Sequence, residues 1–189
     1  MSRSGTVRAN GQELYYEVHG EGQPLILVMG LGYDSTLWTL AQVPALSPKF
    51  QVVIFDNRDA GRSSQATSPY TIADMADDTA ALMDALDIKK AHVCGLSMGG
   101  MIAMEFALRH PGRLDRMILT GAPGAPARAV FHPVMTWNWV QGERQDRRDL
   151  RLPAIHLAVL RRVPAQQGGG SADRRDAVEQ SQPGRPAGL

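Results

Sequence analysis

Several features are scarce or missing in this sequence, and each absence narrows what the protein can be. Cys94 is the only cysteine, so no disulfide can form within the chain, as expected in a reducing compartment. The longest nearly apolar run, residues 24–31, is too short to cross a bilayer, and residues 1–11 lack the apolar stretch of a signal peptide. The formal net charge of +1 gives no electrostatic reason to expect a nucleic-acid or anionic-membrane partner. We therefore expect a cytoplasmic protein with no membrane span and no nucleic-acid partner.

Aromatic residues and lysine are absent from residues 141–189, although this segment holds nine arginines. All eleven aromatic residues lie at or before Trp139. The segment also contains the glycine- and proline-rich runs QGGGS and QPGRP, at residues 167–171 and 182–186. A chain with so little to bury cannot offset the entropy lost on folding. We expect an ordered core over residues 1–140 and a divergent, partly disordered tail over residues 141–189.

Residues 1–120 alternate between short apolar runs and segments with helical periodicity. Helices of more than ten residues between apolar strands predict right-handed crossovers, and so an α/β fold with a mainly parallel sheet. In the helix over 71–86, the aspartates at 74, 77 and 78 are expected to face water. In such sheets the chemistry lies at the carboxyl ends of the strands. The expected strands are residues 13–19, 24–29, 50–55, 91–96 and 114–120, and the expected helices are residues 34–46, 71–86 and 98–110.

The segment Gly95-Leu96-Ser97-Met98-Gly99 has the form G-x-S-x-G between an expected strand and an expected helix. This context indicates a nucleophile elbow, in which the serine occupies a sharp turn and small neighbours let strand and helix pass closely. Ser97 is then the nucleophile, and the backbone N–H of Met98 can donate to a developing oxyanion. The alternative is a plain strand–turn–helix with a capping serine.

The run Met29-Gly30-Leu31-Gly32 follows the strand over 24–29, where a second oxyanion donor usually lies. The N–H of Leu31 is our candidate. A plain turn is the alternative, and a phosphate loop is disfavoured because no G-K-[ST] follows the glycines. After the next strand, Asp56 and Arg58 are interpreted as structural residues that hold the loop and the elbow.

These motifs resemble those of the α/β-hydrolase family, in the branch of esterases, enol-lactonases and cofactor-free haloperoxidases. The matching segments are YYEVHG, LILVMGLG, FDNRDAGRSS, CGLSMGGMIAMEFALRHP and RMILTGAPG, all within residues 5–140. The resemblance implies an α/β-hydrolase fold, C-terminally incomplete here. It also implies Ser97 as nucleophile, Leu31 and Met98 as the oxyanion hole, and no cofactor or metal. Esters, lactones and related small carbonyl compounds are the implied substrates.

The partners that a serine nucleophile needs are harder to find, because the chain has no Gly-His pair near its end. Three histidines, at 19, 92 and 110, match scaffold positions at the wrong places for a base. His156, in the apolar run 152–160, is the candidate base, and His132 is the alternative. The acid is undetermined: Asp149 precedes His156 by only seven residues, and Asp115 begins a strand at the wrong end of the sheet.

The strand over 114–120 would be an open apolar edge unless another segment covers it. The run 152–160 covers it, or the chain associates with itself there, or it folds poorly.

A changed reading frame near residues 140–144 would explain the altered composition of residues 141–189; a compact natural variant is the rival explanation. The frame hypothesis is wrong if the alternative frames beyond codon 140 encode neither a strand followed by Asp nor a Gly-His pair.

Three functions follow from this pattern. The first is an esterase or lipase acting through an acyl-enzyme on Ser97. The second is lactone opening, perhydrolysis or C–C cleavage at the same site. The third is a weak or inactive hydrolase fragment that serves as a binding module.

Overall fold

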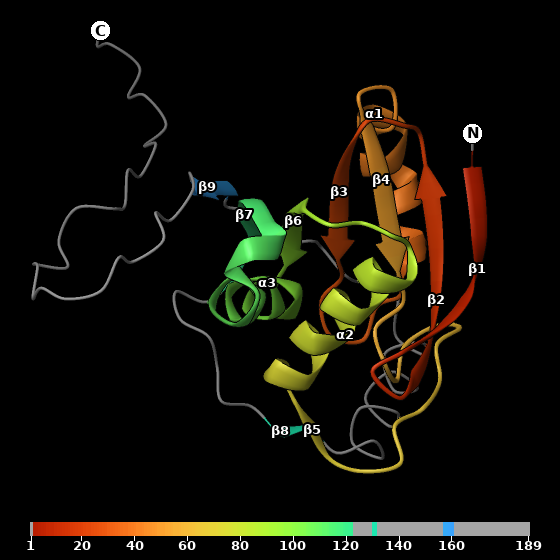
Figure 1. Ribbon diagram of the computed structural model, residues 1–189, viewed down its shortest axis with the longest axis vertical. Coiled ribbons are helices and arrows are strands. Elements are labelled where there is room, and N and C mark those ends of the chain that lie inside the picture. Colours follow the sequence, from red (N-terminus) through yellow and green to blue (C-terminus); the bar gives the residue numbers. More distant parts are fainter. Residues whose placement is uncertain (1, 123–129, 132–156, 161–189) are drawn as a thin grey trace, which may run out of the picture.

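The computed structural model describes residues 2–122, 130–131 and 157–160 (Figure 1). Its main element is a seven-stranded sheet in the order β1-β2-β4-β3-β6-β7-β9. The inner strands β3, β4, β6 and β7 run parallel to their neighbours among themselves, while β1, β2 and β9 are joined antiparallel. This confirms the predicted α/β fold with a mainly parallel sheet. The strands are β1 (Ser2–Ala9), β2 (Gln12–His19), β3 (Gln23–Val28), β4 (Phe50–Phe55), β6 (Ala91–Leu96), β7 (Leu114–Thr120) and β9 (Leu157–Leu160), and a separate pair joins β5 (Tyr70–Thr71) to β8 (Val130–Phe131).

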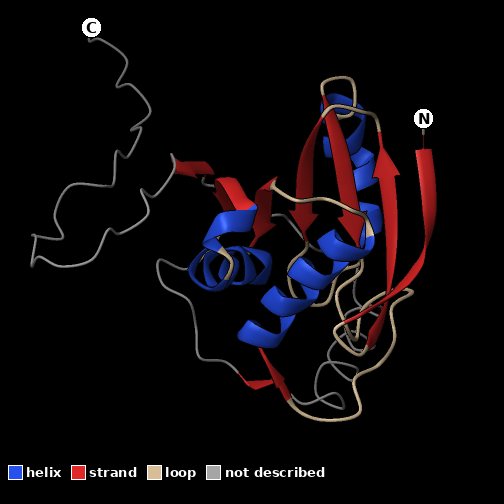
Figure 2. Ribbon diagram, in the orientation of Figure 1, coloured by secondary structure: helices blue, strands red, loops and turns tan. Residues whose placement is uncertain are grey.

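Helices cover both faces of the sheet (Figure 2). The helices α2 (Ile72–Ala85) and α3 (Met98–Arg109) pack on one face, and the short helices η1 (Ser35–Leu40) and α1 (Gln42–Leu46) pack near β4 on the other. Alternate residues of β3 and β4 enter two separate apolar clusters, one under each helical layer. These strands are therefore buried on both faces, as their continuous apolar runs predict.

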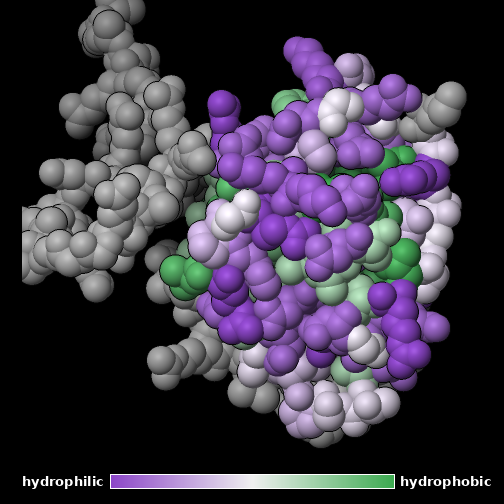
Figure 3. Space-filling view, in the orientation of Figure 1, coloured by the Kyte–Doolittle hydropathy of each residue, from purple (hydrophilic) through white to green (hydrophobic). Residues whose placement is uncertain are grey.

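The outer surface of the α2 and α3 layer is mostly hydrophilic (Figure 3). Leu40 and Leu108 are the exposed large hydrophobic residues among those that the structure describes. No helix in the described part of the chain is long and apolar enough to cross a membrane.

Two elements differ from the sequence-based expectation. The strand β1 was not predicted, because its residues are polar and only Ala9 is buried. The expected helix over 34–46 is divided into η1 and α1, with Ala41 in a non-helical conformation between them. Pro44 explains the division, since it has no N–H for residue 40 and its ring would clash with that carbonyl in a continuous helix.

The expectation that Asp78 faces water is wrong. Its side chain is 3 % exposed and receives two hydrogen bonds of 2.6 Å from Arg58. Helical periodicity placed Asp78 on the polar stripe of α2, but the loop after β4 covers that position.

The edge of β7 is paired with β9 over four residues, from Met117 opposite Leu160 to Thr120 opposite Leu157. Part of the run 152–160 therefore covers the strand, which was one of the three outcomes considered. Self-association through β7 stays a prediction. Residues 117–120 are already paired with β9, so this part of the strand offers no free edge to a second copy.

A capping box begins α2 and offers a small, local test of the fold. Thr71 Oγ1 accepts from the Asp74 N–H at 3.3 Å, and the Asp74 carboxylate accepts from the Thr71 N–H at 2.7 Å. We expect Thr71→Ala to lower the free energy of unfolding by about 1 kcal/mol in urea titrations. Thr67→Ala, on an exposed loop, is the control; an equal loss in both variants would contradict a capping role.

Candidate active site

Ser97 lies on a sharp turn between the carboxyl end of β6 and the first residue of α3. Its backbone has φ 53° and ψ −115°, a combination that L residues rarely adopt. Such a conformation costs on the order of 1–3 kcal/mol and must be held by its surroundings. The Ser97 N–H donates to the Thr120 carbonyl at 2.8 Å, which ties the turn to the end of β7. Ser97 is exposed at this turn.

Two glycines allow the backbone to make this turn. A Cβ on Gly95 would collide with the carbonyl oxygen of Gly99, and a Cβ on Gly99 would collide with the carbonyl of Val28. The strand β6 and the helix α3 therefore approach backbone to backbone, and α3 also meets the end of β3. These contacts explain why small residues flank Ser97.

The loop after β3 lies beside Ser97. A Cβ built on Gly30 would be 3.3 Å from the Cβ of Ser97 and 3.1 Å from the Leu96 carbonyl oxygen. Leu31 follows at once and packs half-buried against the apolar cluster under α2 and α3. The structure therefore brings together Ser97, Met98 and the loop that carries Leu31, at the carboxyl ends of β3 and β6.

Met98 begins α3, so its N–H has no carbonyl to bond within the helix. The N-terminal end of a helix also carries partial positive charge, which favours an anion there. The assignment of the Leu31 and Met98 N–H groups as an oxyanion hole stays a prediction.

The three histidines of the described residues all lie at the amino end of the parallel strands. His19 pairs with Val52 near the start of β4 and contacts Glu17 at 2.9 Å. His92 is the second residue of β6, about 16 Å along the strand from Ser97. His110 directly follows α3, about 20 Å along the helix from Ser97. None of the three is placed to accept the Ser97 proton, as the sequence predicts.

Each of these histidines also has a local acidic neighbour. His92 Nδ1 lies 3.3 Å from Asp115, and burial lowers the pKa of His92 despite that carboxylate. His110 Nε2 lies 2.8 Å from Asp77. These pairs join elements at the amino end of the sheet. The remaining candidates, His132, His156 and the acid Asp149, lie outside the described residues, so their roles stay predictions.

Asp56 and Arg58 make the contacts of structural residues. Asp56 accepts from the N–H and Oγ of Ser35 at 2.8 and 2.6 Å, and from Arg62. Arg58 binds Asp78 on α2 through two hydrogen bonds. They anchor the loop after β3 and the helix α2, and within the described part of the chain neither side chain forms a hydrogen bond with the Ser97 turn.

The loop after β4 holds a polar contact that sequence reasoning missed. The Asn57 amide donates to the Met29 carbonyl at 3.0 Å, and Asn57 is 3 % exposed. Its position directly after a strand that neighbours β3 was the available signal, but a single asparagine does not reveal its partner.

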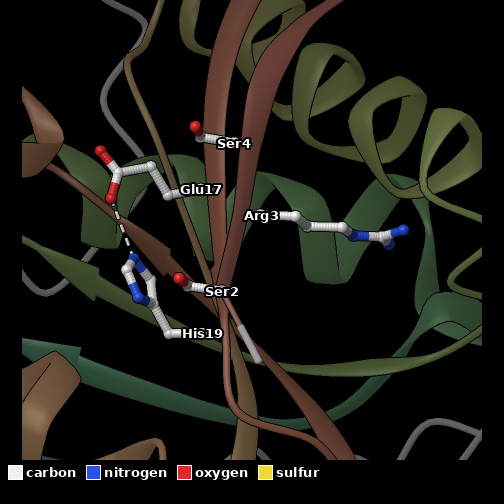
Figure 4. A pocket seen from close by; sticks show the side chains of 5 residues that line it. All are labelled: Ser2, Arg3, Ser4, Glu17 and His19. Carbon is white, nitrogen blue, oxygen red and sulfur yellow. Dashed lines mark hydrogen bonds and ion pairs between the residues drawn. The ribbon is translucent and has the colours of Figure 1, made fainter.

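A shallow depression on the β1–β2 hairpin is lined by Ser2, Arg3, Ser4, Glu17 and His19 (Figure 4). Glu17 already accepts from Tyr15 and Arg62 as well as contacting His19. Two strands, β4 and β3, separate this hairpin from β6 and Ser97. The depression is therefore separate from the Ser97 turn. Among the described residues, no cluster of three or more His, Cys, Asp or Glu side chains could hold a metal ion.

Known proteins share this fold. A family described as the alpha/beta hydrolase fold matches residues 23–176, which extends beyond the expected boundary at residue 140. A putative carbamate hydrolase RutD from Caulobacter sp. (strain K31) is 43% identical over 129 residues, covering 66% of this chain and 46% of that protein. A RutD from Azorhizobium caulinodans is 41% identical over 107 residues, covering 57% of this chain and 40% of that protein.

Solved structures of other hydrolases are also similar to this chain. The enol-lactonase from Burkholderia xenovorans LB400 is 39% identical with a TM-score of 0.58, and the match covers 60% of this chain and 45% of that one. A meta-cleavage product hydrolase from Pseudomonas fluorescens IP01 is 37% identical with a TM-score of 0.61, covering 64% and 45%. The chain thus spans less than half the length of these relatives.

Proposed function

Because the chain belongs to the α/β-hydrolase family, we propose that it is a serine hydrolase that cleaves small carbonyl substrates through an acyl-enzyme on Ser97. One observation carries the proposal. Ser97 occupies a strained turn at the N-terminus of α3, exposed and beside the loop that carries Leu31. A capping serine needs no such backbone, and the Ser97 side chain makes no capping hydrogen bond to α3.

The chemistry follows from this placement. Ser97 Oγ attacks the substrate carbonyl carbon, its proton passes to a base, and the π electrons of the carbonyl move to oxygen. The N–H groups of Leu31 and Met98 donate to that oxyanion. The oxyanion collapses, the leaving alcohol takes the proton from the base, and the acyl group stays on Ser97. Water then repeats the steps and releases the acid, so no cofactor is required.

Carboxylic esters are the proposed substrate class. A lactone is an internal ester, and the likeness to an enol-lactonase makes lactones the nearest variant. The likeness to putative carbamate hydrolases adds carbamates, whose carbonyl is attacked in the same way. Carbamates are the less reactive class, because nitrogen donates electrons into the carbonyl. Assays should therefore compare p-nitrophenyl butyrate with a lactone and a carbamate.

The second candidate function is a weak or inactive hydrolase that serves as a binding module. One observation favours it: no histidine in the described part of the chain lies near Ser97. Without a base, the oxyanion hole and binding alone would leave about 10³- to 10⁴-fold acceleration over water.

Covalent labelling separates the two candidates. A fluorophosphonate reacts with a serine hydroxyl only when a base activates it, forming an O–P bond and expelling fluoride. We expect one label on the purified full chain by intact mass spectrometry, mapped to Ser97 and absent in Ser97→Ala. His156→Ala and His132→Ala identify the base by slower labelling. A wild-type chain that stays unlabelled would reject the catalytic proposal and favour the binding module.

A further inference from the structure

The loop between Met29 and Ser35 is held at both of its ends by two consecutive side chains. At the first end, Asn57 Nδ2 donates to the Met29 carbonyl at 3.0 Å. At the other end, Asp56 Oδ1 accepts from the Ser35 N–H at 2.8 Å and the Ser35 hydroxyl at 2.6 Å. Leu31 lies between these two attachments.

The sheet topology explains why these side chains meet. The strand β4 runs parallel to β3, so the loops that follow both strands leave the same edge of the sheet. Asp56 and Asn57 are the first two residues after β4. The four residues of the clamp, Met29, Ser35, Asp56 and Asn57, are each at most 3 % exposed. Water therefore does not compete for these hydrogen bonds, and losing one leaves a buried group unpaired.

The Asp56 end of the clamp is kept charged by its neighbours. Burial alone would raise the pKa of Asp56, but hydrogen bonds from Arg62 and Ser35 lower it below the usual value. Arg62 in turn stacks on the Tyr15 ring at 3.5 Å and donates to Glu17. The attachment at Ser35 is thus tied to β2.

The held loop is in contact with the Ser97 turn. Gly30 directly follows the carbonyl that Asn57 binds, and a Cβ on Gly30 would be 3.3 Å from the Cβ of Ser97. A shift of this loop would move the Leu31 N–H relative to an oxyanion on a substrate joined to Ser97. A misplacement of about 1 Å can cost on the order of 100-fold in rate.

We propose that Asn57 is a positioning residue that, together with Asp56, holds the loop of residues 29–35 so that the Leu31 N–H stays aimed at the oxyanion. The inference rests on the proposed function, because it needs a reaction at Ser97. It adds a residue that acts through the loop and does not touch the substrate.

The test compares kcat and KM for p-nitrophenyl butyrate in the full chain. We expect Asn57→Ala to lower kcat by about 10- to 100-fold with KM changed less than about threefold, since a misaimed donor weakens the transition state more than the ground state. The affinity for phenylboronic acid, which forms a tetrahedral adduct on serine, should fall in parallel. Thr79→Val is the matched control: it removes another buried side-chain hydrogen bond to a carbonyl, that of Met75 on α2, and should leave kcat unchanged.

A second variant covers the case in which Asn57→Ala does not fold. In Asn57→Asp, a protonated carboxyl can still donate to the Met29 carbonyl, whereas a carboxylate repels it. The ratio of wild-type to variant kcat should therefore be smaller at pH 5.5 than at pH 8.

Each outcome decides the inference. If wild-type turnover does not depend on Ser97, the proposed function fails and the inference fails with it. If turnover depends on Ser97 but Asn57→Ala keeps its kcat, or falls only as much as Thr79→Val, the inference alone is overturned. A pH-independent ratio near one for Asn57→Asp also overturns it.

Discussion

Ser97→Ala is expected to lower kcat/KM for p-nitrophenyl butyrate by about 10⁴-fold or more. Without the hydroxyl no acyl-enzyme can form, and only the oxyanion donors and substrate binding remain. The substitution itself is mild for folding, because Ser97 is exposed and its backbone N–H still bonds Thr120. The measurement is initial rate against substrate concentration for the purified full chain.

Activated esters also react slowly with surface nucleophiles, so this test needs a control serine. Ser68 is exposed on the loop before β5, and Ser68→Ala should keep the wild-type kcat/KM. Turnover that survives in Ser97→Ala would mean that the observed hydrolysis does not use the elbow. Equal losses in both variants would point to a preparation artefact and not to a nucleophile.

Arg58→Met is expected to lower the free energy of unfolding by about 3–5 kcal/mol at pH 7.5. The Arg58 and Asp78 side chains are 7% and 3% exposed and share two hydrogen bonds of 2.6 Å. Methionine fills much of the arginine volume but leaves the buried carboxylate without its cation. Among the described residues, the Asn10 amide, at 2.9 Å, is the donor that Asp78 would keep. Urea titrations followed by circular dichroism measure the loss.

The loss of unfolding free energy in Arg58→Met should be smaller at low pH than at high pH. Burial raises the pKa of Asp78, and the Arg58 guanidinium opposes that rise. Removing Arg58 raises the pKa of Asp78 further, so folding of the variant takes up a proton at any pH between the unfolded and the folded pKa of this carboxyl. A raised carboxyl pKa makes stability fall as pH rises through it, and the deficit should therefore be smaller at pH 5 than at pH 7.5.

Arg109→Met is the matched control for this pair. Arg109 also binds an aspartate of α2, Asp77, through two nitrogens, but its side chain is 43% exposed. Solvent screens such a pair, so we expect a loss of no more than about 1 kcal/mol. Similar losses in both variants, or a deficit in Arg58→Met that does not change with pH, would contradict the role of burial.

Much of the fold could be predicted from local patterns in the sequence. Residues 50–55, 91–96 and 114–120 form β4, β6 and β7 with the predicted bounds. The G-x-S-x-G motif correctly placed a tight turn at Ser97, because the glycines that permit the turn adjoin the residue that needs it. The expectation that His19, His92 and His110 lie away from Ser97 also followed from their places in these elements.

The misjudged features depend on contacts between distant parts of the chain. Asp78 lies on the polar stripe of α2 by periodicity, yet Arg58, twenty residues earlier, buries it. Asn57 reaches Met29 across 28 residues. The strand β1 has almost no apolar residues and forms by hydrogen bonding along β2.

By itself, the sequence determined the parallel βα order, the tight turn at Ser97 and the glycines beside it, because each is encoded by neighbouring residues and by the period of apolar side chains. Only the tertiary structure decided which polar residues are buried and what they hold. Arg58, Asp56 and Asn57 are three neighbours in one loop, and pattern alone cannot assign their partners. Those partners lie on α2 and on the loop after β3, and they come within reach only when the sheet brings the carboxyl ends of β3 and β4 together.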